Sequence, residues 1–469
     1  MPDERFEEHL NHPVGRGHAV ADGHAGSAGG SICGDIVRID VRVQGERVVD
    51  AGFEASGCGA LTAAASACVD LVRGAPLLGA ARVGSADVAA QLGGLSAGKL
   101  HAADLAADAL ARALGAAAVE QAAMAPRADR VLVAMSGGVD SAVAALRIRP
   151  THPSVAAVTL ELWRDAENDS EGSCCSASAV RSARALAHRM GIPHLTVDLR
   201  DAFRAGVVQP WLDDHAAGLT PNPCVRCNGR VRLDAMADLA ARLGAAAVAT
   251  GHYARVTEDG LLRAAADPSK DQSYMLAGLR PETIARMRFP LGELTKDRVR
   301  AIAAEHGLPV ANKPDSQDLC FLAGTGRARF LERHGGIGDR PGPIVDRRGN
   351  ELGRHRGAHR FTVGQRRGLE IGGAGEPLYV LGTDTAAGTV TVGPRVELAT
   401  TEVALRDVVL HRGPEAVEAV KLRYRSPAVP CALDGDMLRL AEPFAGAAPG
   451  QVAVLLRGDA IVGSGTIRS

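Results

Sequence analysis

The chain has 469 residues, of which 46% are hydrophobic and 23% charged, and its formal net charge is −1. This composition excludes a disordered or fibrous chain and predicts a globular protein of roughly three domains. The near-neutral total neither supports nor excludes a nucleic-acid partner until charge is resolved along the chain. Nine cysteines, an odd number, argue against a disulfide framework and favour reduced thiols that bind metal or carry out chemistry.

The N-terminus carries no signal-peptide pattern. Its first thirty residues are acidic and then rich in glycine and histidine, and no apolar run in the chain is long enough to span a bilayer. We therefore expect a cytoplasmic protein with no membrane partner.

An α+β domain is predicted over residues 1–120. Residues 34–56 alternate polar and apolar around a turn at Gln44–Glu46, which indicates a hairpin with one buried face. Ala-rich helical patterns follow at 59–73 and 101–118. A weakly patterned stretch at 119–129, which contains Pro126, is the predicted linker.

Two cysteines and an aspartate flank the predicted hairpin, which suits a soft metal site. With His12-Pro13, Gly17 and Lys99-Leu100-His101, these residues resemble the NifU/IscU-type iron–sulfur scaffolds. The resemblance implies an N-terminal cluster held by Cys33, Asp35, Cys58 and His101. The family's third cysteine is absent, because Ala102 follows His101. A degenerate scaffold that serves only as a docking surface remains the alternative.

A glycine loop at Ser136–Ser141 follows the apolar run 131–135 and precedes the helical pattern 142–146. This order predicts a strand, a loop and a helix whose N-terminal N–H groups suit pyrophosphate. No lysine stands where a Walker A loop needs one. The segment instead resembles the PP-loop of ATP pyrophosphatases. That resemblance implies adenylation of an oxygen, release of pyrophosphate, and a place for Asp140 beside magnesium and pyrophosphate.

The remaining pattern predicts three further domains. Alternating strands and helices indicate a doubly wound parallel sheet over 128–325, with ATP at the carboxyl ends of the strands. A small central basic domain follows over 326–398, where 327–368 hold eleven arginines against four acidic residues. Such an excess is a natural site for phosphate contacts. Short strands with Gly/Pro turns over 399–469 predict a C-terminal β-barrel.

A Cys-x-x-Cys pair, Cys224 and Cys227, lies in a proline-stiffened loop before a helical pattern, and Cys320 follows further along. A thiol at a helix start has a pKa below the free value of about 8.5, so we expect thiolate near neutrality. Alone, this pair is shared by zinc sites and redox pairs.

Together with the glycine loop, these segments resemble the tRNA-specific 2-thiouridylases over about residues 128–469. The match includes the segments 249–253, 270–274, 289–292, 315–316, 362–368, 423–425 and 448–451. The resemblance implies ATP-dependent 2-thiolation of the wobble uridine of tRNA, through adenylation of the base and sulfur transfer.

The resemblance also implies residue roles. ATP would be bound by Ala134, Met135, Ser136, Gly137, Gly138, Val139, Asp140, Ser141, Leu160 and Gly251. Cys227 would be the nucleophile and Cys320 the carrier of persulfide sulfur. The residues expected to contact tRNA are Asn222, Pro223, His252, Lys270, Asp271, Gln272, Arg366, Arg367, Arg423, Tyr424 and Gln451, with Tyr424 as a stacking platform. ATP and Mg²⁺ are the implied cofactors, and the partners are tRNA and a cysteine desulfurase or other sulfur donor.

Cys224 departs from the family pattern, since many members carry aspartate there. Three thiols, Cys224, Cys227 and Cys320, resemble the set of iron–sulfur-dependent tRNA thiolases, and we favour a 4Fe-4S cluster on them over a persulfide relay. A zinc site is the structural alternative. The vicinal pair Cys174-Cys175 is interpreted as local structure.

Two other functions remain open: an iron–sulfur carrier with an ATP-binding domain, and a PP-loop synthetase acting on another acceptor. Joining a scaffold-like domain to a thiolase would raise the effective concentration of a sulfur carrier at the catalytic loop. We therefore expect residues 1–118 to deliver a cluster or sulfide in cis.

Overall fold

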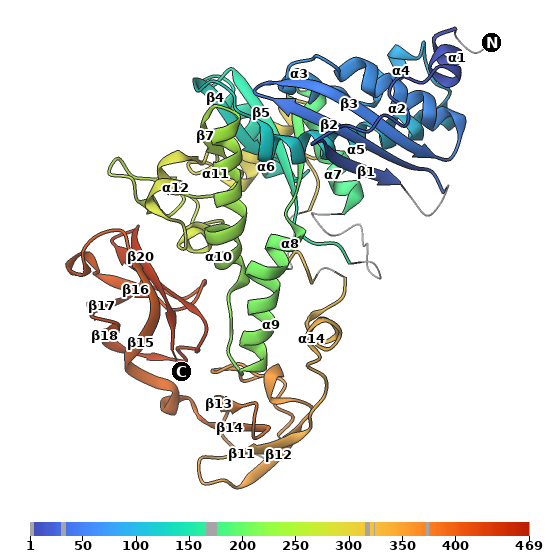
Figure 1. Cartoon of the computed structure of the whole chain (residues 1–469). Helices are drawn as coiled ribbons and strands as arrows, with labels where there is room; N and C mark the ends of the chain where they lie inside the picture. Colours follow the sequence, from blue (N-terminus) through green and yellow to red (C-terminus); the bar gives the residue numbers. More distant parts are fainter. Residues whose placement is uncertain are drawn as a thin grey trace. The chain divides into compact units, whose positions relative to one another are not determined.

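The computed structural model describes residues 4–29, 34–165, 176–314, 319–322, 324–371 and 375–468. The chain forms two compact units, and each is described by itself. The first consists of Met1–Arg200, Ala235–His252 and Arg286–Cys320, and the second of Asp201–Asp234, Tyr253–Ala285 and Phe321–Ser469. Figure 1 labels many of the elements of both.

The first unit begins with an α+β module. Its elements are α1 (Glu4–Asn11), β1 (His24–Gly29), β2 (Ile36–Gln44), β3 (Arg47–Ser56), α2 (Gly59–Val72), α3 (Leu77–Ala80), α4 (Ser85–Gln91) and α5 (Leu100–Gln121). The strands form an antiparallel sheet in the order β1-β2-β3, and α5 packs on it. Alternate residues of β2 (Val37, Ile39, Val41) are fully buried, so the predicted hairpin and its buried face are confirmed.

A parallel sheet forms the rest of the first unit. Its strands are β4 (Arg127–Ala134), β5 (Ser154–Glu161), β6 (His194–Asp198), β7 (Ala245–Ala249) and β10 (Met287–Arg288), in the order β10-β7-β4-β5-β6. The helices are α6 (Val139–Ile148), α7 (Ala177–Arg189), α11 (Leu233–Arg242, which begins in the second unit) and α13 (Lys296–Glu305). The centre of β4 is buried continuously because helices cover both faces of such a sheet. The predicted parallel α/β domain is confirmed.

The N-terminal module is docked on this sheet through α5. Gly115 of α5 lies so close to edge strand β6 that a Cβ there would be 1.9 Å from the carbonyl oxygen of Thr196. Asp108 of α5 accepts hydrogen bonds from Arg184 of α7 at 2.6 Å and from Arg112 at 3.3 Å. Arg112 also pairs with Glu161 of β5. Burial lowers the pKa of Arg112, but the two carboxylates outweigh it and hold that pKa above its usual value.

The connection predicted over 119–129 is shorter in the structure, where it spans 122–126. Helix α5 continues to Gln121 and β4 already begins at Arg127. Between them, the N–H of Ala123 donates to Gly45 at 2.9 Å and that of Met124 donates to Arg242 at 2.9 Å. The connection is therefore short and hydrogen-bonded to both modules, and it does not form a tether.

The second unit joins helices to a small sheet and a barrel. Its helices are α8 (Arg200–Phe203, whose first residue belongs to the first unit), α9 (Gln209–Ala216), α10 (Pro223–Cys227), α12 (Pro281–Arg286, whose last residue belongs to the first unit) and α14 (Arg327–Gly335). The central sheet has the order β12-β11-β14-β13, with β11 (Gly342–Val345), β12 (Glu351–His355), β13 (Leu378–Asp384) and β14 (Thr389–Pro394). Ile344, Val380 and Val390 are fully buried in its core.

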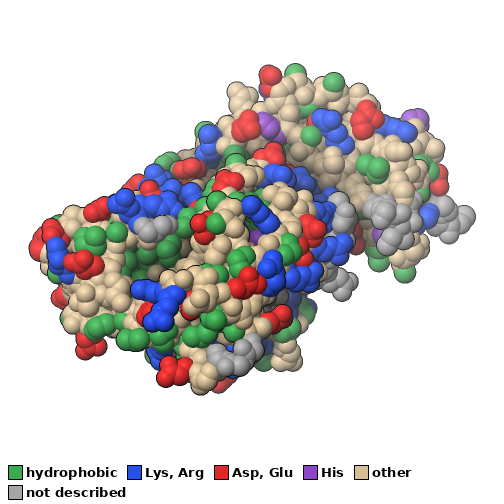
Figure 2. All heavy atoms as spheres, turned by 90° about the horizontal axis from the view of Figure 1, so that it is seen from below, with side chains coloured by type: hydrophobic (Ala, Val, Ile, Leu, Met, Phe, Trp, Pro, Cys, Tyr) green, Lys and Arg blue, Asp and Glu red, His purple; other side chains and the backbone are tan. Residues whose placement is uncertain are grey.

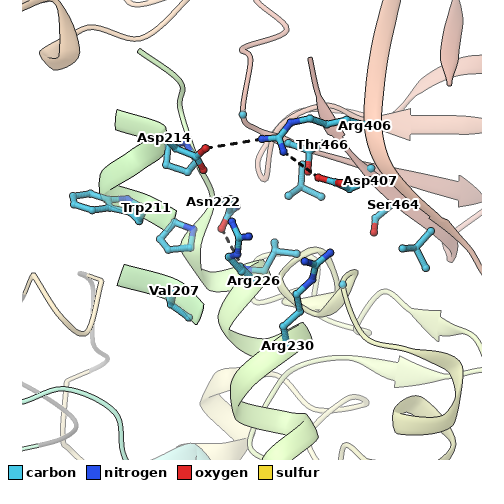
Figure 3. Close-up of a pocket in the computed structure, with 18 residues that line it drawn as sticks. Val207, Trp211, Asp214, Asn222, Arg226, Arg230, Arg406, Asp407, Ser464 and Thr466 are labelled. Atoms are coloured by element: carbon cyan, nitrogen blue, oxygen red, sulfur yellow. Dashed lines mark hydrogen bonds and ion pairs between the residues drawn. The ribbon is translucent and has the colours of Figure 1, made fainter. Parts of the chain in front are cut away.

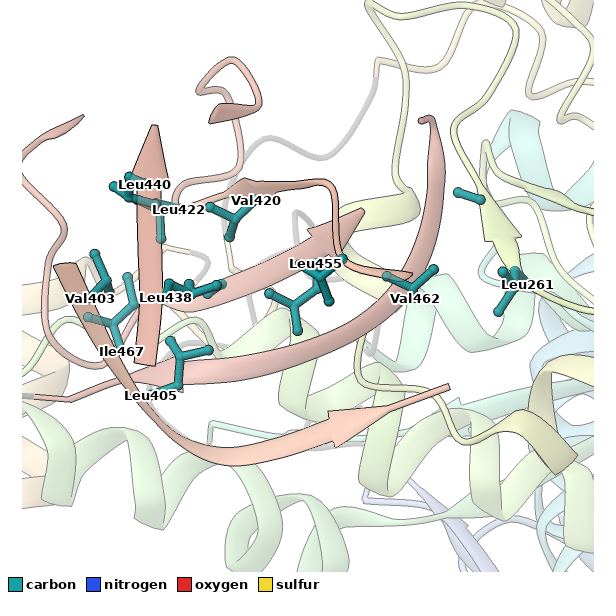
Figure 4. Close-up of a cluster of buried hydrophobic side chains, with 13 residues drawn as sticks. Leu261, Val403, Leu405, Val420, Leu422, Leu438, Leu440, Leu455, Val462 and Ile467 are labelled. Carbon is teal, nitrogen blue, oxygen red and sulfur yellow. The ribbon is translucent and has the colours of Figure 1, made fainter. Parts of the chain in front are cut away.

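The C-terminal strands close into a barrel. They are β15 (Ala399–Leu410), β16 (Ala419–Lys421), β17 (Val429–Asp434), β18 (Met437–Ala445), β19 (Val452–Arg457) and β20 (Ala460–Ile467). Their order is β15-β18-β17-β16-β19-β20, and β15 pairs again with β20 to complete the ring. The short strands β8 (Arg255–Val256) and β9 (Leu262–Arg263) extend it beside β20. Leu405, Leu438, Leu455 and Val462 lie in its buried interior (Figure 4), which confirms the predicted barrel.

Candidate functional site

The glycine loop forms an open anion cradle between β4 and α6. Gly137 adopts a φ of +69°, which favours glycine, and Gly138 is the N-cap of α6. The Ser141 hydroxyl donates to the carbonyl of Gly138 at 3.0 Å and accepts from the N–H of Ser136 at 3.2 Å, which fixes the loop. Within the part of the chain that the structure describes, the N–H groups of Gly137, Gly138 and Val139 donate to no partner. They remain available to a phosphate oxygen.

Gly251 and the end of β4 are brought to this loop. A Cβ on Gly251, which follows β7, would lie 2.8 Å from the backbone nitrogen of Ser141, so the approach requires glycine. Ala134 and Met135 end β4 and lead directly into the cradle, and the carbonyl of Met135 accepts from Thr159 at 2.8 Å. Leu160 lies on the neighbouring strand β5, near its carboxyl end. The predicted ATP-binding residues thus gather at the carboxyl edge of the sheet.

Two lysines that the sequence analysis did not assign also lie at the loop. The Lys296 ammonium of α13 donates to both carboxylate oxygens of Asp140, at 2.8 and 2.7 Å. Lys313 donates to the carbonyl of Gly137 at 3.0 Å. Only five of the 53 basic residues are lysines. That scarcity was the available signal, because a lysine in so arginine-rich a chain marks a position where a compact, flexible ammonium differs in use from a planar guanidinium.

The Cys-x-x-Cys pair occupies the short helix α10. The Asn222 side chain caps this helix by accepting from the N–H of Val225 at 3.4 Å, and a π-helical turn, Asn228–Arg232, follows. Cys224 and Cys227 are three residues apart and therefore share one face. Burial raises the pKa of the Cys224 thiol, which the nearby Arg232 only partly offsets. The predicted lowering of the thiol pKa is wrong for Cys224, because desolvation outweighs the dipole of a five-residue helix.

Cys320 is half-buried, and the residue after it is firmly anchored in the second unit. The Phe321 ring packs edge-on against Trp211 at 5.3 Å and against Phe330 at 5.2 Å. The adjoining segment 315–318, which holds the predicted Asp315–Ser316 motif, lies outside the described residues, as do Cys33, Cys174 and Cys175.

Several predicted tRNA-binding residues hold loops of the second unit together. The Gln451 amide donates to the carbonyl of Thr220 at 2.6 Å, and the Thr220 N–H donates to Pro449 at 2.8 Å. These bonds fix the Pro221–Asn222–Pro223 segment against the barrel. The Asp271 carboxylate accepts from the N–H groups of Ala265 and Ser273, at 3.0 and 3.1 Å.

Arg423, Tyr424 and Gln272 are likewise engaged within the unit. Arg423 donates to the carbonyls of Val363 and Gly446, and burial lowers its pKa. The Tyr424 hydroxyl donates to the carbonyl of Asp271 at 3.1 Å, and its ring lies 5.6 Å from that of Tyr274. Gln272 accepts from the N–H of Tyr253 at 2.9 Å.

The remaining predicted tRNA residues differ in their surroundings. In the first unit, His252 exchanges a hydrogen bond with Thr250 at 2.8 Å. The Lys270 N–H donates to Asp267 at 3.1 Å. Arg366 and Arg367 are exposed, and neither guanidinium group makes a hydrogen bond or ion pair with the described residues, although the carbonyl of Arg367 accepts from the Gln365 amide at 2.9 Å. Elsewhere in the arginine-rich segment the charge is largely paired, as by Arg356 with Asp339. Figure 2 accordingly shows basic side chains interspersed with acidic ones on the face seen there.

Three potential metal ligands converge in the N-terminal module. Single ligand atoms of Asp35, Cys58 and His101 lie within 4.8 Å of one another. The Asp35 carboxylate accepts from the N–H of Cys58 at 2.9 Å and from its thiol at 3.2 Å, and lies 3.3 Å from Nε2 of His101. Burial and this carboxylate raise the pKa of the Cys58 thiol. Soft sulfur and nitrogen donors beside one oxygen fit a transition-metal or iron–sulfur ligand set.

Four family models match the chain in succession. They are the NifU-like N terminal domain (residues 3–122), the tRNA methyl transferase HUP domain (129–324), the tRNA methyl transferase PRC-barrel domain (328–394) and the aminomethyltransferase beta-barrel domain (402–467). Among the described residues, no helix combines the length and apolarity needed to cross a membrane.

Solved structures resemble separate parts of the chain. A putative iron–sulfur cluster assembly scaffold protein of Fervidobacterium islandicum is 14% identical, covering 24% of this chain and 95% of its own, with a TM-score of 0.20. The U34-tRNA thiolase NcsA from Methanococcus maripaludis with its 4Fe-4S cluster is 18% identical, covering 42% and 62%, with a TM-score of 0.28.

Proteins related in sequence match a much larger part of this chain than these solved structures do. The tRNA-specific 2-thiouridylase MnmA of Frankia casuarinae is 47% identical over 350 residues, which are 72% of this chain and 99% of the relative. The bifunctional protein NifU/MnmA of Rubrobacter xylanophilus is 43% identical over 490 residues, which are 100% of this chain and 99% of the relative. The chain therefore belongs to the family of bifunctional NifU/MnmA proteins, in which a NifU-like module is joined to a tRNA-specific 2-thiouridylase.

Proposed function

We propose that the chain catalyses ATP-dependent 2-thiolation of the wobble uridine of tRNA, and its MnmA relatives are named tRNA-specific 2-thiouridylases. The observation that carries this proposal is the open cradle at Ser136–Ser141, with Lys296 and Lys313 at its rim. A cradle of free N–H groups at a helix start binds a polyanionic leaving group, and an iron–sulfur carrier has no use for one.

The proposed reaction has two steps. The uracil C2 oxygen attacks the α-phosphorus of ATP, and the bond from that phosphorus to pyrophosphate breaks. Sulfur then attacks C2, and the oxygen leaves with AMP. In the first step the cradle N–H groups and Lys313 face the charge that builds up on pyrophosphate. Asp140, held by Lys296, would contribute a carboxylate oxygen to Mg²⁺ bound with the phosphates.

For the sulfur route, we propose a 4Fe-4S cluster held by Cys224, Cys227 and Cys320. In the alternative persulfide relay, Cys227 is the nucleophile and Cys320 carries the persulfide sulfur. Two thiols on one face of α10 fit joint ligation of a cluster, and such a 4Fe-4S cluster would supply a sulfur-binding iron. Iron and acid-labile sulfide analysis of Cys224→Ala decides between the routes. Unchanged cluster content would remove Cys224 as a ligand and favour the persulfide relay.

The N-terminal site is proposed to hold a separate cluster on Cys33, Asp35, Cys58 and His101 and to receive sulfur from a desulfurase. In the second unit, we propose that Asn222 and Pro223 face the target uridine. Arg366 and Arg367, exposed and unpaired within the described residues, are the proposed phosphate contacts. Gln451, Asp271, Gln272 and Arg423 are proposed to position these loops through the hydrogen bonds that they make.

The direct test is nucleoside mass spectrometry of unmodified tRNA incubated anaerobically with the iron-reconstituted protein, ATP, magnesium and sulfide. ATP-dependent 2-thiouridine is the expected product, with one pyrophosphate released per modified base. Pyrophosphate release without a thiolated base would point to a PP-loop synthetase with another acceptor. If neither pyrophosphate nor 2-thiouridine forms, the proposal is contradicted and the carrier function is supported.

A further inference from the structure

A pocket in the second unit lies beside the loop proposed to face the target uridine. It opens between α9, α10 and strands β15 and β20, and its volume is about 790 Å³ including open solvent (Figure 3). Pro221, Asn222 and Pro223 form part of its wall. Whatever occupies it is therefore adjacent to the proposed target base.

Three arginines line this pocket, and they are not equivalent. Arg406 of β15 is paired with Asp407 at 3.0 Å and approaches Asp214 to 3.9 Å. The guanidinium groups of Arg226 and Arg230 make no hydrogen bond or ion pair with any residue that the structure describes, although burial raises the pKa of the nearby Asp214 and the charge of Arg226 acts to lower it. Figure 3 shows Arg230 reaching up toward the pocket from the helical segment below. The pocket thus contains two guanidinium groups without a bonded carboxylate, although both stand on ordered backbone.

The barrel side of the pocket is built by an irregularity in β15. The pairing of β15 with β20 shifts between Arg406 and Val409, and Asp407 there adopts a φ of +53°. Such bulges redirect side chains, and positive φ in a residue other than glycine persists only where the surroundings enforce it. The bulge aims Arg406 and Asp407 at the pocket and leaves Val409 42% exposed on its wall.

We propose that this pocket binds a nucleotide of the tRNA anticodon loop adjacent to the target uridine. Arg226 and Arg230 contact its phosphate, and its base lies on the apolar wall that includes Pro221 and Val409. This combination of unpaired cations and exposed apolar surface is what single-stranded RNA requires, because each nucleotide presents an anion and a flat apolar face. The inference rests on the proposed function, since it assigns the second nucleotide of the same substrate.

The test combines variants of the full-length protein with modified RNA. Anticodon stem-loops carry a neutral methylphosphonate at the phosphate on one side or the other of the target uridine. Their affinities are measured by fluorescence anisotropy for wild type and for Arg226→Gln/Arg230→Gln. The matched control is Arg82→Gln/Arg189→Gln, which removes two exposed arginines from the first unit.

One of the two neutral linkages should weaken binding to wild type about tenfold and leave the pocket variant unaffected. In a plot of the logarithm of the binding constant against the logarithm of the salt concentration, the slope of the pocket variant should be smaller in magnitude by about 1, as expected for one to two lost phosphate contacts. The control should behave as wild type. If the pocket variant and wild type respond equally to both linkages, the proposal is overturned, and an acidic protein segment becomes the better occupant. Thiouridine formation by wild type on the same RNA tests the proposed function separately, since the binding cycle does not require turnover.

Discussion

Asp108→Asn should loosen the docking of the N-terminal module on the parallel sheet. The Asp108 side chain is only 4% exposed, and its partner Arg184 is 6% exposed at a distance of 2.6 Å. Arg184 stands on α7 of the parallel-sheet domain, whereas Asp108 stands on α5 of the module. The substitution leaves a buried guanidinium without its counter-charge in the middle of the interface.

Removing one partner of a buried ion pair costs about 3–5 kcal/mol. Asparagine keeps the shape and one acceptor oxygen, so we take the lower end, about 3 kcal/mol. Since about 1.4 kcal/mol corresponds to a factor of ten, opening of the interface should become more frequent by a factor of about 150. A shift of this size is a large part of the stability of an ordinary domain.

Hydrogen exchange followed by mass spectrometry measures this opening locally, which a single unfolding midpoint of a multidomain chain does not. Peptides from α5 and β6 should exchange faster in Asp108→Asn, whereas barrel peptides should not change. Asp104→Asn is the matched control, because Asp104 is an exposed residue of the same helix. Asp108→Asn/Arg184→Met should lose less than the sum of the single changes, because no buried charge is left unpaired. Equal exchange in Asp108→Asn and Asp104→Asn would refute the reasoning.

Three further predictions concern the two sites and the aromatic cluster. Lys296→Met should slow ATP-dependent pyrophosphate release by ten- to a hundredfold with little effect on the KM for tRNA, since hydrogen bonds to charged groups are worth about 1.5–3 kcal/mol. Lys421→Met is the control, and an equal effect of the two substitutions would contradict the assignment of Lys296 to the glycine loop. Cys58→Ser should lower the iron bound per chain after reconstitution, whereas Cys431→Ser should not; unchanged iron would exclude the N-terminal site. His215 of α9 belongs to the aromatic cluster, because its ring lies 4.4 Å from that of Trp211. Burial lowers the pKa of His215 to about 4, so its neutral form stabilises the fold above the ordinary pKa near 6.5, and that stability is lost as pH falls toward 4. His215→Phe should therefore reduce the decrease in the free energy of unfolding, measured by urea denaturation, between pH 7 and 5. An unchanged dependence of that free energy on pH would refute this.

Sequence patterns predicted the elements that depend on local periodicity. The hairpin β2–β3, the strand–loop–helix at Ser136–Ser141 and the C-terminal barrel follow from alternation and turn residues, which act over a few positions. The proximity of the Asp35, Cys58 and His101 side chains was also predictable, because each residue stands at the end of a helix or strand in the NifU-like module.

What the sequence could not show depends on contacts between distant segments. The pairing of Asp140 with Lys296 joins residues 156 positions apart. The raised pKa of Cys224 follows from burial, which helix position does not reveal. From the sequence, Gly115 is a single residue of low helix propensity in an Ala-rich helix, although its lack of a side chain allows the backbone of β6 to approach.

This docking changes how the fusion is understood. Delivery in cis through a higher effective concentration assumes a flexible link whose length sets the encounter rate. Here α5 serves two surfaces at once, because it packs on the module's own sheet and also covers edge strand β6 of the parallel sheet. The residues between α5 and β4 are hydrogen-bonded to both. An exposed edge strand is an aggregation hazard, so removal of residues 1–118 would uncover β6 as well as remove the proposed metal site. Loss of activity in a 128–469 fragment would therefore not demonstrate sulfur delivery, and Cys58→Ser, which leaves α5 in place, is the variant that separates the two roles.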